Sequence, residues 1–188
     1  MIIGNVSKYY LISDLHLNHK RIITDFGFRP ENYEKLIINN WKNTVHPQDI
    51  VFDLGDVTWG SQENLLNIIS DLPGTKILIR GNHDRTHSDN WFIKAGYSLV
   101  LKKAQIDNII LSHFPSDLSD KEVERGIINI HGHFHNVESS KWEEKLVKRI
   151  TKNHYLFSLE DIGYKPVLLD SAVKNNLVLN CKKMLENL

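Results

Sequence analysis

Five short apolar runs, rich in β-branched residues, each end in a cluster of polar side chains that can ligate metals. The runs occupy residues 9–12, 50–52, 77–79, 109–111 and 127–130. Runs of this length and composition are typical of buried strands. In an open α/β sheet, ligands bind beyond the carboxyl ends of the strands. The pattern therefore predicts an α/β fold that brings five polar strand ends to one site.

The polar clusters have a fixed order along the chain. They read Asp14-Leu15-His16, Gly55-Asp56, Gly81-Asn82-His83-Asp84, Ser112-His113 and Gly132-His133-Phe134-His135. Any one fragment can simply cap a turn or a helix. The ordered set indicates a two-metal hydrolytic site, and the alternative is a group of buried, hydrogen-bonded polar residues at strand ends.

The order and spelling of these clusters resemble the calcineurin-like metallophosphoesterase superfamily, whose signature runs D-x-H, G-D, G-N-H-[DE], H and G-H-x-H. The chain matches all five blocks, and the segments Ser158-Leu159-Glu160 and Tyr164-Lys165-Pro166 look like the end of small single-domain microbial members. The resemblance implies an α/β fold of two facing mixed β-sheets flanked by helices, a four-layer sandwich. It also implies a single metallophosphoesterase domain over residues 1–188.

The same resemblance implies which residues hold two divalent ions. One ion would take Asp14, His16, Asp56 and His135, and the other would take Asp56, Asn82, His113 and His133, with Asp56 as the bridge. Two ions about 3.5–4 Å apart need such a mixture of nitrogen and oxygen ligands. Mn²⁺ is the expected metal, with Fe, Zn, Ni and Mg as alternatives. On an extended segment His133 and His135 would point the same way, with Phe134 directed into packing.

The implied reaction is in-line attack of a metal-bridging hydroxide on phosphorus, with His83 protonating the leaving oxygen or stabilising the transition state. The phosphoprotein phosphatases of the superfamily continue G-D-x-V-D-R-G, whereas this chain has Trp59 and Gly60 in place of the aspartate and the arginine. The departure argues against a phosphoprotein phosphatase. It also leaves the residue that orients His83 open, with Asp84 as a candidate.

Three further residues are candidates for substrate binding: Arg85, His19 and Trp59. Trp59 could stack on a nucleotide base or pack in the core, and the other two could equally be surface or capping residues. The function expected from the whole pattern is hydrolysis of a small or nucleotide-type phosphodiester. The alternatives are a phosphomonoesterase and a catalytically inactive interaction scaffold.

Chain length and charge limit the classes of protein to which the sequence can belong. A chain of 188 residues with 41% hydrophobic residues is long enough for one real core. Lys plus Arg and Asp plus Glu each number 23, so no global basic field favours binding of a long nucleic acid. The absence of a signal sequence or of an apolar run near the ~20 residues of a membrane helix predicts a cytoplasmic protein. The lone Cys181 is expected to be a buried packing residue.

Helical periodicity predicts elements between the strands. Helices are expected at 31–45, from Ser61 to Ile69, after Ser88 or Asp89, and after Ser119 or Asp120. A last, continuous helix is expected to begin near Asp170 or Ser171 and to reach Leu188. A hairpin is expected at 105–112. The charged segment 141–152 is interpreted as a solvated insertion beside the site or as a substrate lid.

Overall fold

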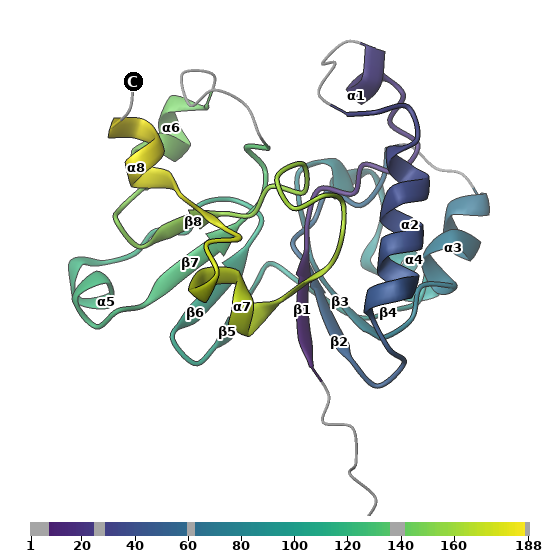
Figure 1. Ribbon diagram of the computed structural model, residues 1–188, viewed down its shortest axis with the longest axis horizontal. Coiled ribbons are helices and arrows are strands. Elements are labelled where there is room, and N and C mark those ends of the chain that lie inside the picture. The colour runs from purple at the N-terminus through teal and green to yellow at the C-terminus, as the bar shows by residue number, and fades with distance from the viewer. Residues whose placement is uncertain (1–7, 25–28, 60–62, 136–141, 187–188) are drawn as a thin grey trace, which may run out of the picture.

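Two five-stranded sheets form the centre of the protein in a computed structural model that describes residues 8–24, 29–59, 63–135 and 142–186 (Figure 1). The first sheet has the order β4-β3-β2-β1-β9 and the second has the order β10-β8-β7-β6-β5. The strands of the first sheet are β1 (Tyr9–Ile12), β2 (Ile50–Asp53), β3 (Thr75–Ile79), β4 (Tyr97–Leu101) and β9 (Val167–Leu168). Those of the second are β5 (Lys103–Ile106), β6 (Ile109–Ser112), β7 (Ile128–His131), β8 (His154–Leu156) and β10 (Leu179–Asn180).

Both sheets are mixed. Strands β1 to β4 run parallel and β9 pairs antiparallel with β1, with Tyr10 opposite Leu168. In the second sheet β6, β7 and β8 run parallel, while β5 and β10 are antiparallel edge strands. The expected hairpin is therefore confirmed as β5–β6. Because the inner strands are parallel, their carboxyl ends meet at one edge of each sheet.

Helices cover the outer side of the first sheet and surround the second (Figure 1). They are α1 (Arg21–Thr24), α2 (Tyr33–Thr44), α3 (Glu63–Ser70), α4 (Asp89–Lys94), α5 (Asp120–Glu124), α6 (Glu144–Val147), α7 (Leu169–Lys174) and α8 (Cys181–Glu186), with a 3₁₀ turn at His83–Thr86. Helix α2 buries Tyr33, Ile37 and Trp41, which recur every four residues and so share one face. The fold is the expected sandwich of two mixed sheets flanked by helices.

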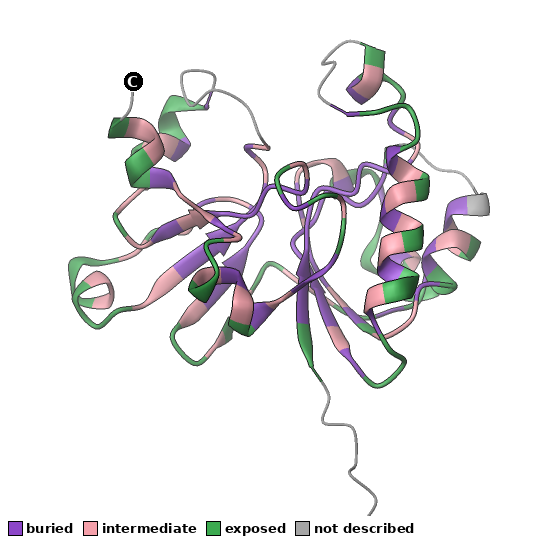
Figure 2. Ribbon diagram, in the orientation of Figure 1, coloured by how far each residue is buried: buried purple, intermediate pink, exposed green. Residues whose placement is uncertain are grey.

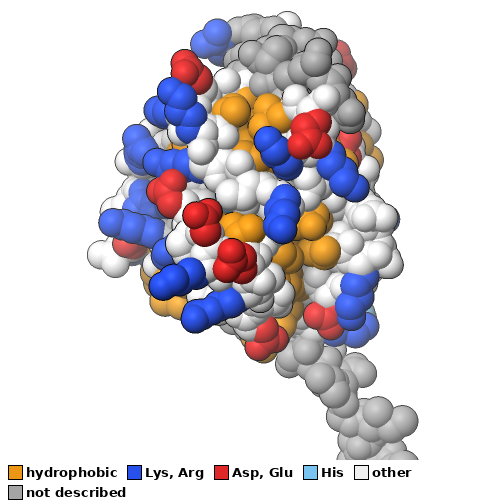
Figure 3. Space-filling view, turned by 90° about the vertical axis from the view of Figure 1, so that its left-hand side faces the viewer, with side chains coloured by type: hydrophobic (Ala, Val, Ile, Leu, Met, Phe, Trp, Pro, Cys, Tyr) orange, Lys and Arg blue, Asp and Glu red, His pale blue; other side chains and the backbone are white. Residues whose placement is uncertain are grey.

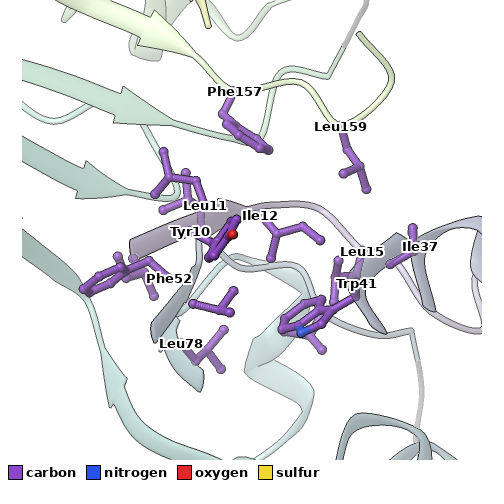
Figure 4. Packing of buried hydrophobic residues seen from close by; sticks show 14 of the residues in the cluster. Tyr10, Leu11, Ile12, Leu15, Ile37, Trp41, Phe52, Leu78, Phe157 and Leu159 are labelled. Carbon is purple, nitrogen blue, oxygen red and sulfur yellow. The ribbon is translucent and has the colours of Figure 1, made fainter. Parts of the chain in front are cut away.

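The main core lies between the two sheets and continues under the helices of the first sheet. It joins Leu11 and Ile12 of β1 to Ile130 of β7 and to Phe157 beyond β8. Figure 4 shows Phe157 and Leu159 lying across from Tyr10, Leu11 and Ile12. Burial is concentrated along these strands and in the loops above them (Figure 2). The loops that follow the strands therefore rest on a packed base.

Helix caps confirm two of the expected helix starts. The Ser88 hydroxyl accepts a hydrogen bond from the Trp91 amide at the start of α4. Ser119 and Glu122 form a reciprocal capping box at the start of α5. The start expected at Ser61 lies outside the described residues.

The continuous C-terminal helix is a wrong prediction. Helix α7 ends at Lys174, Asn176 takes a left-handed φ of 51°, and Leu179–Asn180 form strand β10 against β8. Two successive Asn residues favour a helix stop over helix propagation. The apolar stripe is thus divided between two short helices, and Cys181, as expected, is buried.

The segment after residue 141 is not simply a solvated insertion. Trp142 is buried and stacks on Phe134 with a centroid distance of 4.4 Å, and Leu146 of α6 is buried in the same cluster. This second, smaller core, which also contains Leu156 and Cys181, fixes α6 beside the second sheet.

Surface charge is mixed on the face beside the second sheet, where Lys and Arg alternate with Asp and Glu around apolar patches (Figure 3). Such interspersion gives this face no field of a single sign. None of the helices in the described part of the chain has the length and apolarity needed to cross a bilayer.

Candidate metal centre

All seven predicted ligand residues lie at the carboxyl edges of the two sheets. The loop after β1 carries Asp14 and His16, and the loops after β2 and β3 carry Asp56 and Asn82. From the second sheet, β6 delivers His113 and β7 delivers His133 and His135. Three groups drawn from these residues and His83 bring their ligand atoms within 4.8 Å of one another: Asp14 with His16 and His135, His16 with Asp56 and His83, and Asp56 with His113 and His133.

Asp56 lies at the middle of the cluster. Its Oδ1 accepts a hydrogen bond of 2.9 Å from the His83 backbone amide. Its Oδ2 lies 3.4 Å from His113 Nε2, 3.7 Å from His83 Nε2 and 3.8 Å from His16 Nε2. Burial acts to raise the pKa of Asp56, but the hydrogen bond and charge of His113 hold it below its usual value. One oxygen is therefore fixed by the backbone, and the other faces three imidazoles as a bridging ligand would.

Asp14, His16 and His135 form the second part of the cluster. The Nε2 atoms of His16 and His135 are 3.2 Å apart, and they lie 3.9 and 3.7 Å from Asp14 Oδ1. His16 Nδ1 is buried and has no hydrogen-bond partner among the described residues. Burial, followed by the nearby His135, lowers the pKa of His16 well below its usual value. A buried, neutral imidazole facing another imidazole is suited to binding a cation.

The orientation of His113 points to the same conclusion. Its Nδ1 lies 2.8 Å from the Leu54 carbonyl, which can only accept a hydrogen bond. In the neutral ring Nδ1 then carries the proton, and Nε2 has only a lone pair and can accept but not donate. Nε2 nevertheless faces two further acceptors, Asn82 Oδ1 at 3.1 Å and the Asp56 carboxylate. Burial opposes protonation of His113, but Asp56 raises its pKa to about 9. Three acceptors that converge in this way require a proton or a metal ion between them.

Five of the seven ligand candidates have a left-handed backbone. The φ angles are 53° at Asp14, 47° at His16, 57° at Asp56, 73° at His133 and 50° at His135. The expected extended His-x-His segment is therefore wrong: it is a turn in which the Phe134 amide donates to the Gly132 carbonyl. Phe134 is buried, as expected. Left-handed backbone at non-glycine residues is uncommon and concentrates at functional sites.

Two motif glycines are required by close approach. A Cβ at Gly81 would lie 2.0 Å from Asp56 Oδ1, and one at Gly132 would lie 2.4 Å from Asp14 Oδ2. Each glycine therefore leaves the space that a neighbouring carboxylate occupies.

Sequence reasoning missed Arg29 and the role of Glu160. The buried Arg29 donates from Nε to Glu160 Oε1 at 2.7 Å, and from Nη1 and Nη2 to the carbonyls of Leu15 and Asp14. Glu160 Oε1 in turn lies 3.3 Å from His135 Nδ1. Burial acts to raise the pKa of Glu160, but His135 and Arg29 lower it to about 2. The only signal for this network in the sequence was the segment Ser158-Leu159-Glu160.

Glu143 is a second carboxylate that was missed. Its Oε1 lies 3.3 Å from His133 Nε2, and its Oε2 pairs with Lys145 at 2.9 Å. Glu143 belongs to the charged segment at 141–152, so no motif marked it. Each histidine of the His-x-His pair thus has a carboxylate partner, as metal-binding histidines often do.

Asp84 does not orient the His83 ring. Its carboxylate is buried and accepts hydrogen bonds from the backbone amides of Gly81, Asp56 and Val57. It therefore joins the loops after β2 and β3, and the proposed orienting role is wrong.

The predicted substrate residues lie at the rim of the cluster. Trp59 is 42% exposed, so the alternative of core packing is wrong. The centroid of its ring lies 4.3 Å from that of His19 and 4.7 Å from that of His83. His19 is buried, whereas the His83 side chain is 29% exposed. Arg85 is exposed, two residues beyond His83.

The donor set fits two divalent cations. The facing Nε2 atoms of His16 and His135 and the converging acceptors around His113 are both explained by bound cations. Imidazole nitrogens mixed with carboxylate and amide oxygens are ligands for Mn, Fe, Zn or Ni.

Comparisons with known proteins agree with this geometry. The family model described as calcineurin-like phosphoesterase matches residues 7–179. An uncharacterized protein of Methanocaldococcus jannaschii, MJ1445, is 34% identical, and the match covers 90% of this chain and 92% of that protein. The Gene 66 protein of Mycobacterium phage L5 is 31% identical over 70% of this chain and 79% of its own length.

Two solved structures share the fold. A protein of unknown function from Aquifex aeolicus, AQ665, superposes with a TM-score of 0.66 at 27% identity, covering 90% of this chain and all of the other. The Pseudomonas putida nuclease MPE gives a TM-score of 0.50 at 18% identity over 68% of this chain and 61% of its own.

Proposed function

Because the chain belongs to the calcineurin-like phosphoesterase family of metal-dependent hydrolases, we propose that it cleaves phosphodiesters at a centre of two divalent ions. The observation that carries the proposal is the position of Asp56 Oδ2, which lies within 4 Å of three imidazoles. We further propose Mn²⁺ as the metal. Asp14, His16, Asp56 and His135 would hold one ion, and Asp56, Asn82, His113 and His133 the other.

The protein residues divide the work around that centre. When bound, two such ions lower the pKa of a shared water and neutralise charge on the phosphoryl oxygens. The hydrogen bonds from Nδ1 of His113 to Leu54 and between Nδ1 of His135 and Glu160 would fix the two rings. The hydrogen bonds of Asp84 would hold the loops after β2 and β3 in register.

In this proposal His83 donates a proton to the leaving oxygen. Its Nε2 lies 3.7 Å from the central carboxylate, and its ring is partly exposed, so it can reach a substrate from the solvent side. A positioned general acid contributes roughly 10²–10⁴ in rate. The grouping of His83 with His16 and Asp56 also allows a ligand role, which the metal content of a His83 variant distinguishes.

The arginines near the site favour a diester. Arg80 binds Asp89 and the carbonyls of Asp84 and His87, and Arg29 binds Glu160, so protein groups already occupy both guanidinium groups. Gly60 stands where phosphoprotein phosphatases have a phosphate-clamping arginine. The exposed Arg85, two residues beyond His83, stays a candidate to contact the phosphate, and with the other two arginines committed the site matches a monoanionic diester better than a dianionic monoester.

The test compares matched esters with the Mn²⁺-loaded protein. We expect bis(4-nitrophenyl) phosphate to be cleaved at least as well as 4-nitrophenyl phosphate. Asp56→Asn is expected to weaken binding of both ions and to abolish turnover, as measured by metal analysis and initial rates. Rapid monoester hydrolysis with negligible diester cleavage would replace this proposal with a phosphomonoesterase, and no hydrolysis of either ester would favour an inactive scaffold.

His83→Ala refines the same experiment. The variant should keep its metal and its fold but lose more activity toward alkyl diesters than toward nitrophenyl diesters, because a basic leaving oxygen needs the proton most. Loss of one ion from this variant would instead identify His83 as a ligand.

A further inference from the structure

Trp59 is an exposed aromatic residue held beside the candidate metal centre. Its side chain is 42% exposed. The other large apolar side chains with comparable exposure in the described residues are Tyr9, Ile93 and Leu99, which lie on β1, α4 and β4. Of these four, only Trp59 packs against the ring of a candidate active-site residue, His83.

The backbone around Trp59 is fixed. Its amide donates to the Leu17 carbonyl at 2.9 Å, and its own carbonyl accepts from Asn18 Nδ2 at 3.3 Å. The adjacent Thr58 forms a parallel bridge with Leu17, and its hydroxyl donates to the same Leu17 carbonyl. The loop after β2 is thus joined to the loop after β1, and the position of the indole follows from the loops that carry Asp14, His16 and Asp56.

Imidazoles support the indole on the side of the site. The rings of His19 and Trp59 are inclined by 38° at a centroid distance of 4.3 Å, and those of His83 and Trp59 by 51° at 4.7 Å. His19 is itself buried, so it forms a firm base for the indole. The remaining exposed surface of the indole is available to a flat ligand.

We propose that Trp59 is a stacking platform for a planar, nucleobase-like group on the leaving side of the scissile bond. The inference rests on the proposed function, since it takes His83 as the group that protonates the leaving oxygen. A leaving oxygen within reach of His83 places the group attached to it next to the Trp59 ring. Stacking on an aromatic ring accepts any base, because every base has a π face. The substrate class is therefore a nucleoside-type phosphoester without strong base preference.

The test measures binding with probes that cannot be hydrolysed. The Mn²⁺-loaded protein is titrated by calorimetry with the methylene phosphonate analogue of adenosine 5′-monophosphate, and separately with the same analogue of ribose 5-phosphate, which lacks the base. Stacking contributes about 1–3 kcal/mol per base, so Trp59→Ala should weaken the adenosine probe roughly 5- to 150-fold. The ribose probe should change little, and Trp59→Phe should retain most of the affinity.

Tyr9→Ala is the matched control, because Tyr9 is equally exposed and packs on Phe52, away from the site. It should leave both affinities unchanged. Equal affinity of the wild-type protein for the two probes, or an adenosine affinity that Trp59→Ala leaves intact, would overturn the platform.

Failure of the platform and failure of the proposed function are distinguishable. If the platform alone is wrong, bis(4-nitrophenyl) phosphate is still hydrolysed, and the two probes bind alike. If the proposed function is wrong, bis(4-nitrophenyl) phosphate is not hydrolysed. Adenosine binding that depends on Trp59 would then support the platform as a nucleotide-binding surface.

Discussion

The two histidines of the His-x-His turn each have a carboxylate partner at 3.3 Å, but the two pairs have very different surroundings. The Glu160 side chain is 5% exposed and is held by Arg29 and by the Ser158 hydroxyl. The Glu143 side chain is 46% exposed and is held by Lys145, which is 78% exposed. One pair has a buried carboxylate, and the other has an exposed one.

The difference in burial indicates which of the two histidines is held more firmly by its carboxylate partner. A surface ion pair is typically worth about 0–1 kcal/mol, because water screens it and two long side chains must be ordered. A buried pair that loses one partner leaves an uncompensated charge, which costs several kcal/mol. His135 should therefore be held firmly by its partner, whereas His133 should depend mainly on its own backbone and on the metal.

The largest effect is expected for Arg29→Met. The substitution removes the guanidinium charge beside the buried Glu160 carboxylate and the hydrogen-bond donor of the Asp14 and Leu15 carbonyls. We expect the free energy of unfolding to fall by about 3–5 kcal/mol, measured by urea denaturation. Lys145→Ala is the matched surface variant and should change it by less than about 1 kcal/mol. Similar losses for the two variants would remove the distinction between the pairs.

A smaller effect is expected from Glu160→Gln, which keeps the shape of the side chain but removes its charge. Loss of such a carboxylate partner costs roughly 10- to 100-fold in metal affinity. We expect that loss in a Mn²⁺ titration, whereas Glu143→Gln, the matched change at the surface, should alter affinity by only a few-fold. An equal loss from Glu143→Gln would mean that the exposed carboxylate orients its histidine as firmly as the buried one.

The smallest effect concerns acid stability of the metal-free protein. The pKa of Glu160 in the folded protein is about 2, below the ordinary value of about 4.3. The ionised carboxylate therefore contributes fully to the free energy of unfolding above that ordinary value, and this contribution is lost as the pH falls toward 2. Urea unfolding at pH 5 and pH 3 should show a steeper decline for the wild-type protein than for Glu160→Gln. The free energy of unfolding of Glu143→Gln should decline as it does for the wild-type protein. An equally steep decline for Glu160→Gln would contradict the depressed pKa of Glu160.

The five polar strand ends could be predicted because the polar residues follow strands directly, and the resemblance to a known family supplied the set of seven ligand candidates. A buried strand has a strong local signature, and its end fixes where the next residues lie. Asp56 and His113 are examples: their positions follow from β2 and β6, and the structure brings their side chains together.

Other features depended on contacts between distant segments. Arg29 lies 131 positions from Glu160 along the chain, and no local pattern marks an arginine that will be buried. The turn at His133 and His135 was misread because alternation suits an extended chain equally well. Asn175 and Asn176 carried a stop signal, but the apolar stripe at helical spacing outweighed it in the prediction of the last helix.

The left-handed backbone at the ligand candidates has a consequence for motion. A non-glycine residue in that region typically costs about 1–3 kcal/mol, and the cost is borne in the loops after β1, β2 and β7. These loops should be among the first parts of the metal-free protein to open, with fast amide hydrogen exchange next to slowly exchanging strands. Metal ions bound by loops of both sheets would then slow amide exchange in all three loops at once. Metal binding would therefore stabilise the folded loops in addition to supplying the chemistry.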